Sequence, residues 1–221
     1  MSTSERSRVK RLPDRGSYDA ETIHAILDAA PVGHVGFVAS GRPVVIPMLF
    51  GRDGDDIFLH GSVASRLLRS MAGGIDVCFT VTLVDGLVLA RSAFHHSMNY
   101  RSVVLFGRAT PVTGDEKKKA LFAISEHLVP GRWDEVRAPN DLELRQTSVL
   151  RLIVEEASAK ARSGGPIDDE EDLALPVWAG VVPCSPVWGE PVPDALLPAG
   201  APPSSAAAAL REASHRRTDS P

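Results

Sequence analysis

Three apolar runs between positions 32 and 62, separated by short turns, constrain the fold of this chain more than any other feature. The runs read VGHVGFVA, RPVVIPMLF and DIFLHGS, and they are linked by Ser40-Gly41 and by the segment GRDGDD. Links this short connect antiparallel neighbours, because a crossover between parallel strands needs roughly a dozen residues or more. The region therefore predicts an antiparallel meander and argues against a sheet built from strand–helix–strand units.

The rest of the chain adds further strands and a few short helices. Apolar residues at helical spacing predict helices at 19–30 with Asp19 as N-cap, at 62–71 with Ser62 as N-cap, at 115–129 and at 139–146. Strands are predicted at IDVCFTVTLV and GLVLARSAF, which meet across Asp85-Gly86, and at NYRSVVLFGRATPV and TSVLRLIVEEASAKAR. Together these elements predict a mainly β fold, an antiparallel β-barrel with peripheral α-helices.

Composition divides the chain into three parts. Residues 1–18 form a polar, basic N-terminal arm, and residues 19–188 are expected to fold as the barrel domain. Residues 189–221 are rich in Ala and Pro and contain no aromatic side chain, so they bury too little apolar surface to offset chain entropy. We therefore expect this tail to be disordered.

Charge and hydropathy argue against two classes of partner. The formal net charge of -4 and the isoelectric point of about 6.0 give no general attraction to a nucleic-acid backbone. No apolar stretch reaches the roughly 18 residues that a membrane-spanning helix needs, and the N-terminus lacks an apolar leader. These features predict a cytoplasmic protein that binds neither nucleic acid nor membrane.

The segment FLHGSVASRLLRSM at 58–71 is a candidate anion site. A strand, a glycine and two serines lead into a helix, where free backbone N–H groups and the helix dipole favour an anion. Ser62 and Ser65 add hydroxyl donors, and the guanidinium of Arg66 suits a phosphate. An ordinary capped surface helix has the same pattern, and the spacing leaves both interpretations open.

Polar and aromatic side chains are concentrated at 89–109, in LARSAFHHSMNYRSVVLFGRA, beyond what a simple turn requires. Adjacent side chains of a strand point to opposite faces, so His95 and His96 are not expected to bind one metal ion together. We predict no metal site. A serine hydrolase is not indicated, because the glycine pattern of a nucleophile elbow is missing.

Two further segments carry groups suited to a flat ring. RPVVIPMLFG at 42–51 places apolar residues around Pro47, either as the floor of a ring site or as a strand of the barrel core. Trp178 and Trp188 lie in Pro-rich segments, where a large aromatic side chain packs on the edge of a core or stacks on a ligand. Spacing does not choose between these alternatives.

Taken together, these motifs resemble the pyridoxamine 5′-phosphate oxidase-like flavin proteins over residues 20–183. The closest branch is the nitroimidazole-resistance and flavin-nucleotide-binding group, and HHSMNYRSVVLFG carries the most specific part of the resemblance. The resemblance implies an FMN-binding split β-barrel. It also implies a homodimer that holds two FMN molecules at sites shared between the subunits.

The resemblance further implies roles for individual residues, in three groups. The isoalloxazine ring would be lined by Val45, Ile46, Pro47 and Met48, with Trp178 closing its side. The ribityl phosphate would be held by His60, Gly61, Ser62, Ser65 and Arg66. The flavin would be approached, from the same or the partner subunit, by Asn99 and Ser102, and the substrate by the candidate catalytic residues His96, Tyr100 and Arg101.

On this basis we expect an FMN-dependent oxidoreductase. A reduced nicotinamide or a deazaflavin would reduce the flavin, and a small electron-poor substrate such as a nitroaromatic or a quinone would take up the electrons. An alternative is a non-catalytic protein that stores or senses a flavin or a haem, with an axial ligand from among His34, His60, His95 and His96. A dimer that keeps the fold without a cofactor is a third hypothesis.

Overall fold

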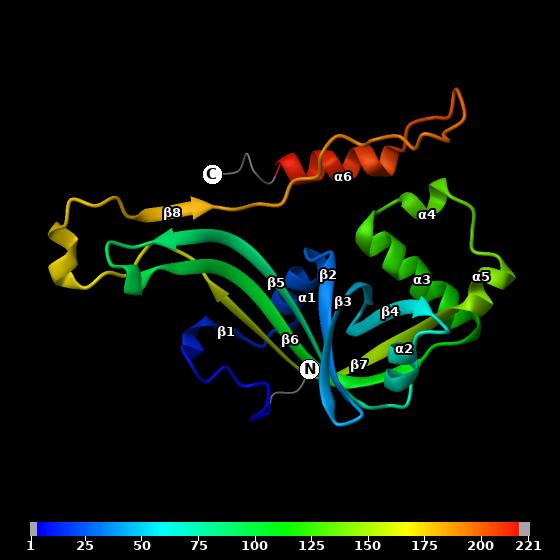
Figure 1. Ribbon diagram of the computed structural model, residues 1–221, viewed down its shortest axis with the longest axis horizontal. Coiled ribbons are helices and arrows are strands. Elements are labelled where there is room, and N and C mark those ends of the chain that lie inside the picture. Colours follow the sequence, from blue (N-terminus) through cyan, green and yellow to red (C-terminus); the bar gives the residue numbers. More distant parts are fainter. Residues whose placement is uncertain (1–3, 217–221) are drawn as a thin grey trace.

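Strands β2 to β7 close an antiparallel barrel (Figure 1). The structure is a computed structural model that describes residues 4–216, without the side chains of Arg66, Leu67 and Arg216. The strands follow each other around the barrel in the order β2-β3-β4-β7-β6-β5, and β5 pairs with β2 to close it. Their bounds are β2 (Val32–Ala39), β3 (Arg42–Asp53), β4 (Asp56–Ser62), β5 (Asp76–Leu89), β6 (Ser97–Pro111) and β7 (Thr147–Arg162). The predicted antiparallel β-barrel with peripheral helices is confirmed.

Alternation along the strands fills the barrel with apolar side chains. Phe50 and Phe79 are fully buried and meet edge to face, with their ring centroids 5.0 Å apart. A Cβ atom on Gly33 would lie 2.1 Å from the Phe79 ring, so only glycine leaves room for this ring. The meander turn is as predicted, because Ser40 and Gly41 both have positive φ, which matches the twist of a two-residue hairpin.

The helices are α1 (Ala20–Asp28), α2 (Arg66–Met71), α3 (Gly114–Leu128), α4 (Arg132–Glu135), α5 (Asp141–Gln146) and α6 (Ser205–Arg216), with 3-10 turns η1 (Pro13–Arg15) and η2 (Ala93–His95). Helices α1, α2, α3 and α5 pack against strands of the barrel from outside, whereas α6 contacts α4. Asp19 caps α1 as predicted, since its carboxylate accepts a hydrogen bond from the Thr22 amide at 2.7 Å. Helix α3 lies directly on β3: a Cβ atom on Gly51 would lie 2.5 Å from the backbone nitrogen of Ile124.

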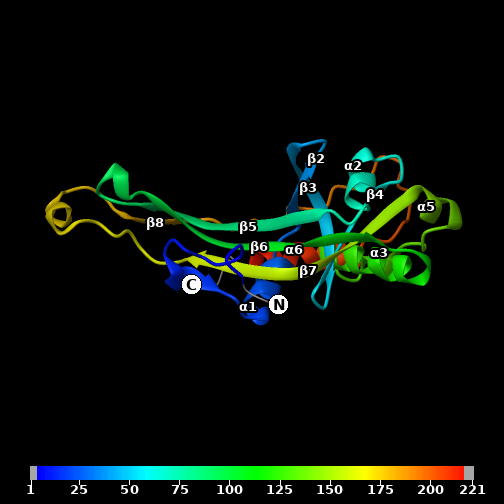
Figure 2. The same ribbon diagram turned by 90° about the horizontal axis from the view of Figure 1, so that it is seen from below.

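Beyond the barrel, β5 and β6 continue as a long arm, which we define as residues 84–100 and 163–183 (Figure 1). The chain passes the end of the arm through η3 (Glu170–Ala174) and returns as β8 (Gly180–Pro183), which pairs with the outer part of β5. Strand β1 (Gly16–Ser17) pairs with the far part of β7. Figure 2 shows that the arm leaves the barrel as a thin, extended layer.

Two predicted boundaries differ from the structure. The pair of strands expected to meet across Asp85-Gly86 is one continuous strand, β5, with a bulge between Val84 and Gly86. A bulge forms instead of a turn because Asp85 is held by β6 and by the residue that follows β8. Its carboxylate binds Arg101 of β6, and its carbonyl accepts a hydrogen bond from the Cys184 amide at 3.1 Å. Ser65, not Ser62, caps α2, since Ser62 still pairs with β7 as the last residue of β4.

The C-terminal tail, expected to be disordered, contains helix α6 in the structure. The tail folds back on itself, with the Trp188 amide donating to Ser214 Oγ at 3.0 Å and Glu190 pairing with Arg211 at 3.0 Å. These polar contacts, and those of α6 with α4, are not visible in composition, which reports only the shortage of apolar surface. At the other terminus, the N-terminal segment lies along β7, where the Arg6 guanidinium donates to the Glu156 carboxylate at 2.8 Å.

Across residues 4–216, none of the helices combines the length and the apolar character needed to cross a membrane.

Candidate functional site

The outward face of β3 separates the four residues predicted to line a ring. Val45 and Pro47 are exposed on this face, Val45 to 65%. Ile46 and Met48 point the other way and pack against the barrel core. Successive side chains of a strand alternate between its faces, so one strand offers a flat ligand Val45 and Pro47 as side chains, and Ile46 and Met48 only through backbone.

The corner between β4 and α2 brings together the backbone of the predicted phosphate site. Ser62 Oγ accepts a hydrogen bond from the Ala64 amide at 3.2 Å, and Ser65 Oγ accepts one from the Leu68 amide at 3.4 Å. Gly61 lies close to the Leu68 side chain, where an added Cβ would be 2.7 Å from Leu68 Cδ1. The Arg66 side chain lies outside the described part of the structure. Phosphate binding at this corner stays a prediction.

His60, near the end of β4, differs from the other predicted phosphate ligands whose side chains the structure describes. Its Nδ1 atom is buried and has no hydrogen-bond partner among the described residues. Burial lowers the pKa of His60 below its ordinary value, because a charged imidazolium is poorly solvated there. The neutral imidazole is the form that binds a metal, and a buried nitrogen without a partner is a position that a ligand can satisfy.

The His60 side chain faces a cavity of about 590 Å³ between β4, α3 and the segment that follows α3. This β4–α3 cavity is lined by Leu49, His60, Leu121, Ile124, Ser125, Leu128, Trp133, Val136, Arg137, Pro139, Glu143 and Thr147. Most of the lining is apolar, and charge is confined to Arg137 and Glu143, which form an ion pair of 2.5 Å. Its volume lies in the range of sites for small organic ligands, roughly 300–1,000 Å³.

Sequence reasoning did not identify most of this cavity. Leu121, Ile124 and Leu128 are visible in the sequence as one face of a helix, and that pattern is equally typical of ordinary packing on a core. Trp133 carries the clearer signal, as a large aromatic side chain in the polar segment GRWDE. Its ring contacts Phe122 edge to face, with centroids 5.7 Å apart.

The group predicted to approach the flavin and the substrate lies on the arm and, for Arg101 and Ser102, on the adjoining part of β6, where its members have local partners. His96 Nδ1 accepts a hydrogen bond from the Ala90 amide at 3.0 Å, and Ser102 Oγ donates to the Lys160 carbonyl at 3.1 Å. Asn99 is buried and contacts Arg162 through its side-chain oxygen. Arg101 forms a two-point ion pair with Asp85, at 3.0 and 2.7 Å. Neighbours on β6 alternate in face, so Tyr100 and Arg101 point to opposite sides of the strand.

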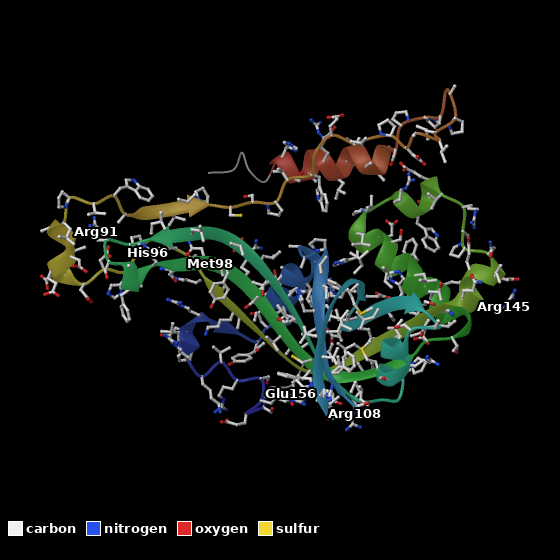
Figure 3. The ribbon with its side chains drawn as sticks, in the orientation of Figure 1. Arg91, His96, Met98, Arg108, Arg145 and Glu156 are labelled. Carbon is white, nitrogen blue, oxygen red and sulfur yellow. The ribbon has the colours of Figure 1, made fainter. Side chains whose placement is uncertain are left out.

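The predicted phosphate site and the group that contains His96 lie far apart within one chain. Figure 3 labels His96 near the tip of the arm, whereas β4 and α2 lie on the far side of the barrel in Figure 1. Trp178, 65% exposed, also belongs to the arm, where it packs on Gly180. One chain therefore does not assemble the complete predicted set.

The other histidines named as alternative iron ligands differ from His60 in their surroundings. His34 is exposed on the outward face of β2, and His95 Nε2 lies 3.1 Å from the Asp169 carboxylate. Within residues 4–216, no group of three or more His, Cys, Asp and Glu side chains is arranged to hold a metal ion. Of these histidines, only His60 combines a buried, unpartnered nitrogen with an apolar cavity in the described structure.

Comparison with known proteins agrees with this architecture. The family described as pyridoxamine 5′-phosphate oxidase matches residues 19–161. The solved structure of the flavocytochrome Anf3 from Azotobacter vinelandii is 42% identical, with a TM-score of 0.87 over 94% of this chain and 97% of that chain. The FAD and heme binding protein from Mycobacterium smegmatis is 37% identical, with a TM-score of 0.86 over 89% of this chain and 97% of that chain.

A third solved structure is a more distant match. A candidate 5-nitroimidazole antibiotic resistance protein from Bacteroides thetaiotaomicron is 25% identical, with a TM-score of 0.54 over 66% of this chain and 86% of that chain. A search of curated proteins gives no significant match. The structures described as a flavocytochrome and as an FAD and heme binding protein therefore resemble this chain along most of its length.

Proposed function

Because this chain belongs to the pyridoxamine 5′-phosphate oxidase family, we propose that it is a homodimeric redox protein that binds a flavin and a haem. Two structures described as a flavocytochrome and as an FAD and heme binding protein support this, at 42% and 37% identity over nearly the whole chain. The FMN expected from the sequence is replaced in this proposal by FAD, the flavin named for one of these proteins.

The observation that carries the haem half of the proposal is the unpartnered Nδ1 atom of His60 beside the apolar β4–α3 cavity. A haem needs an axial ligand, an apolar site for its ring and a polar rim for its two propionates. His60 offers the ligand as a neutral imidazole, Leu121, Leu128 and Trp133 offer the apolar wall, and Arg137 offers a cation at the rim. These residues fit the group.

The flavin half of the proposal uses the outward face of β3 and the corner at α2. Val45 and Pro47 would contact the ring, while Gly61, Ser62, Ser65 and Arg66 would approach its phosphate groups. Leu49 continues the same face of β3 and also lines the β4–α3 cavity, so the two groups would lie near each other. Asn99, Tyr100, Arg101, Ser102, His96 and Trp178 would reach this face from the partner's arm.

Bound flavin and haem would supply two-electron and one-electron chemistry, respectively. The chain's residues would bind and orient both groups, and the apolar lining of the β4–α3 cavity would keep water from the haem. The electron donor would be a reduced nicotinamide or a deazaflavin, and the acceptor a small electron-poor molecule. His96 is the candidate for moving protons at the substrate, since an imidazole ring can both accept and donate a proton.

Absorption spectra of the purified full chain test this proposal. We expect flavin bands together with a Soret band after supply of FAD and haem. His60→Ala should shift or abolish the Soret band and leave the flavin bands unchanged, whereas the matched His95→Ala on the arm should alter neither. An unchanged Soret band in His60→Ala would place the iron ligand elsewhere, and a chain that takes up neither group would end the proposal.

Sedimentation tests the shared site. Val45→Asp places a charge on the exposed outward face without touching the barrel core, so the folded chain should remain but bind flavin and its partner more weakly. A monomeric wild-type chain that holds flavin tightly would contradict a site completed by a second arm.

A further inference from the structure

One wall of the β4–α3 cavity is a short segment between α3 and α5, residues 131–139, which we call the cavity wall. It contributes Trp133, Val136, Arg137 and Pro139 to the lining. Its first turn is fastened to α3, because Glu126 accepts hydrogen bonds from the amides of Gly131 at 2.6 Å and Trp133 at 3.1 Å. Its far end is fastened to α5 by the ion pair between Arg137 and Glu143.

The middle of the cavity wall is fastened to the C-terminal tail. Glu135 accepts hydrogen bonds from Ser204 Oγ at 2.6 Å, Ser205 Oγ at 2.5 Å and the Ala206 amide at 2.9 Å. These donors lie at the start of α6, where the first N–H groups of a helix need acceptors. A carboxylate from α4 therefore caps a helix that is distant in sequence, and joins the two.

Glu135 itself does not line the cavity, but its neighbours along the chain do. Trp133 is two residues before it, and Val136 and Arg137 follow it directly. Arg132 adds a further donor to the same carboxylate at 2.7 Å. A shift of Glu135 would move its neighbours on the cavity wall, so the position of α6 and the shape of the cavity are mechanically linked.

We propose that Glu135 is a positioning residue through which the C-terminal helix α6 holds the cavity wall in the shape that binds haem. This inference rests on the proposed function, since the ligand of the cavity is taken from it. The tail that composition predicts to be disordered would thereby act on haem affinity indirectly, through Glu135. The occupied cavity and the docked tail should stabilise each other, because coupling between two sites is reciprocal.

The negative charge on Glu135 strengthens its hydrogen bonds to Ser204, Ser205 and Ala206, a set of contacts that we call the joint. Hydrogen bonds from Ser204 and Ser205, followed by the Ala206 amide and Arg132, hold the pKa of Glu135 well below its ordinary value. The carboxylate therefore stays ionised at neutral and mildly acidic pH, where its hydrogen bonds are charge-assisted and stronger than those between neutral groups. The joint is lost only as the pH falls through this lowered value.

Variants from the two sides of the joint test the proposal in the full chain. Glu135→Ala removes the acceptor, and Ser204→Ala with Ser205→Ala removes two donors from the tail without touching Arg132. Each should raise the dissociation constant for haem about ten-fold, measured by titration of the Soret band. The matched control Glu190→Ala breaks an ion pair inside the tail and should leave haem affinity unchanged.

Combining the two sets of changes should give little more loss than either alone, since both remove the same joint. Flavin affinity and the urea midpoint should stay near the wild-type values. Haem affinity equal to that of the wild-type chain in all variants would overturn the inference. A combined variant that loses the sum of the two separate losses in haem-binding free energy would also overturn it.

Hydrogen exchange of the protein without haem gives a second readout. In Glu135→Ala and in the double serine variant, amides of 131–139 and of 205–216 should both exchange faster, whereas Glu190→Ala should leave 131–139 protected. Exchange that rises only in the tail would overturn the coupling. A wild-type chain that binds no haem would instead end the haem half of the proposed function, and the exchange data would still decide whether α6 braces the wall.

Discussion

The barrel and the arm are held together by different forces. In the barrel, Phe50, Phe79, Leu59 and Leu105 are fully buried, so burial of apolar surface stabilises it. In the arm, Phe94 is 87% exposed and Val182 46% exposed, and the contacts between side chains include ion pairs. Arg91 binds Asp168, whose side chain is only 1% exposed, at 2.9 Å.

This difference leaves the apolar core of the barrel covered within one chain and much of the apolar surface of the arm exposed. Scattered exposed apolar residues are normal, but a thin extended layer that combines Phe94, Trp178 and Val182 leaves much apolar surface uncovered. A partner that covers the arm would supply the burial that the barrel obtains by itself. Substitutions should therefore act on folding when they fall in the barrel, and on local order or assembly when they fall in the arm.

Replacing one phenylalanine by alanine in the barrel and one in the arm should give the largest difference in the free energy of unfolding. Phe79→Ala removes a fully buried ring and should lower the free energy of unfolding by about 3–5 kcal/mol, because it leaves a cavity. Phe94→Ala, on the arm, should change it by less than about 0.5 kcal/mol. Urea denaturation measures both. A large loss in Phe94→Ala would show that the arm shares the cooperative core of the barrel.

A second pair compares ion pairs in the two regions. Arg91→Ala leaves the buried Asp168 carboxylate without its guanidinium partner, so the segment 163–178 should become sensitive to protease. The urea midpoint should move little, because this segment lies outside the barrel. Arg108→Ala breaks an exposed pair of 3.3 Å with Asp76 and should change neither measurement. Equal protease resistance in both variants would remove the distinction.

The smallest expected effect concerns pH and His60, on the barrel side of the comparison. Burial lowers the pKa of His60 in the folded chain below the ordinary value of 6.5, so the unfolded chain binds more protons between these two values. Stability should therefore fall as the pH decreases from 7 toward 5, and His60→Gln should make this slope shallower. Unfolding free energies at a series of pH values measure it. Identical slopes would indicate that His60 is well solvated.

Most of the barrel could be predicted from the sequence, because its signals are local. Alternating apolar residues identify β2, β3, β4 and β7, and the Ser40-Gly41 turn fixes the first hairpin. The single strand β5 could not be predicted, since Asp85-Gly86 has the composition of a turn and becomes a bulge only when Arg101 and the Cys184 amide bind Asp85. Strand β8 is equally hidden, because four residues among prolines show no period.

The candidate site was predictable only in part. His60 was identified as one of several histidines, but the feature that separates it from the others, its unpartnered Nδ1 atom, depends on packing by α3 and the cavity wall. The sequence likewise shows that Val45 to Met48 are apolar, and the pleat then divides them between two faces. Roles assigned by resemblance to His96, Tyr100 and Arg101 stay predictions, since one chain keeps them far from β4.

Strand β8 has a consequence for solubility. Where β5 leaves the barrel, its edge from Gly86 to Leu89 would present free amides and carbonyls beside the exposed Leu87, and β8 occupies that edge. An open, apolar strand edge is a template for pairing with other molecules, and growth of such pairs produces fibrils. A chain shortened before residue 180 would keep its barrel core yet expose this edge, so storage lifetime should drop before thermal stability does.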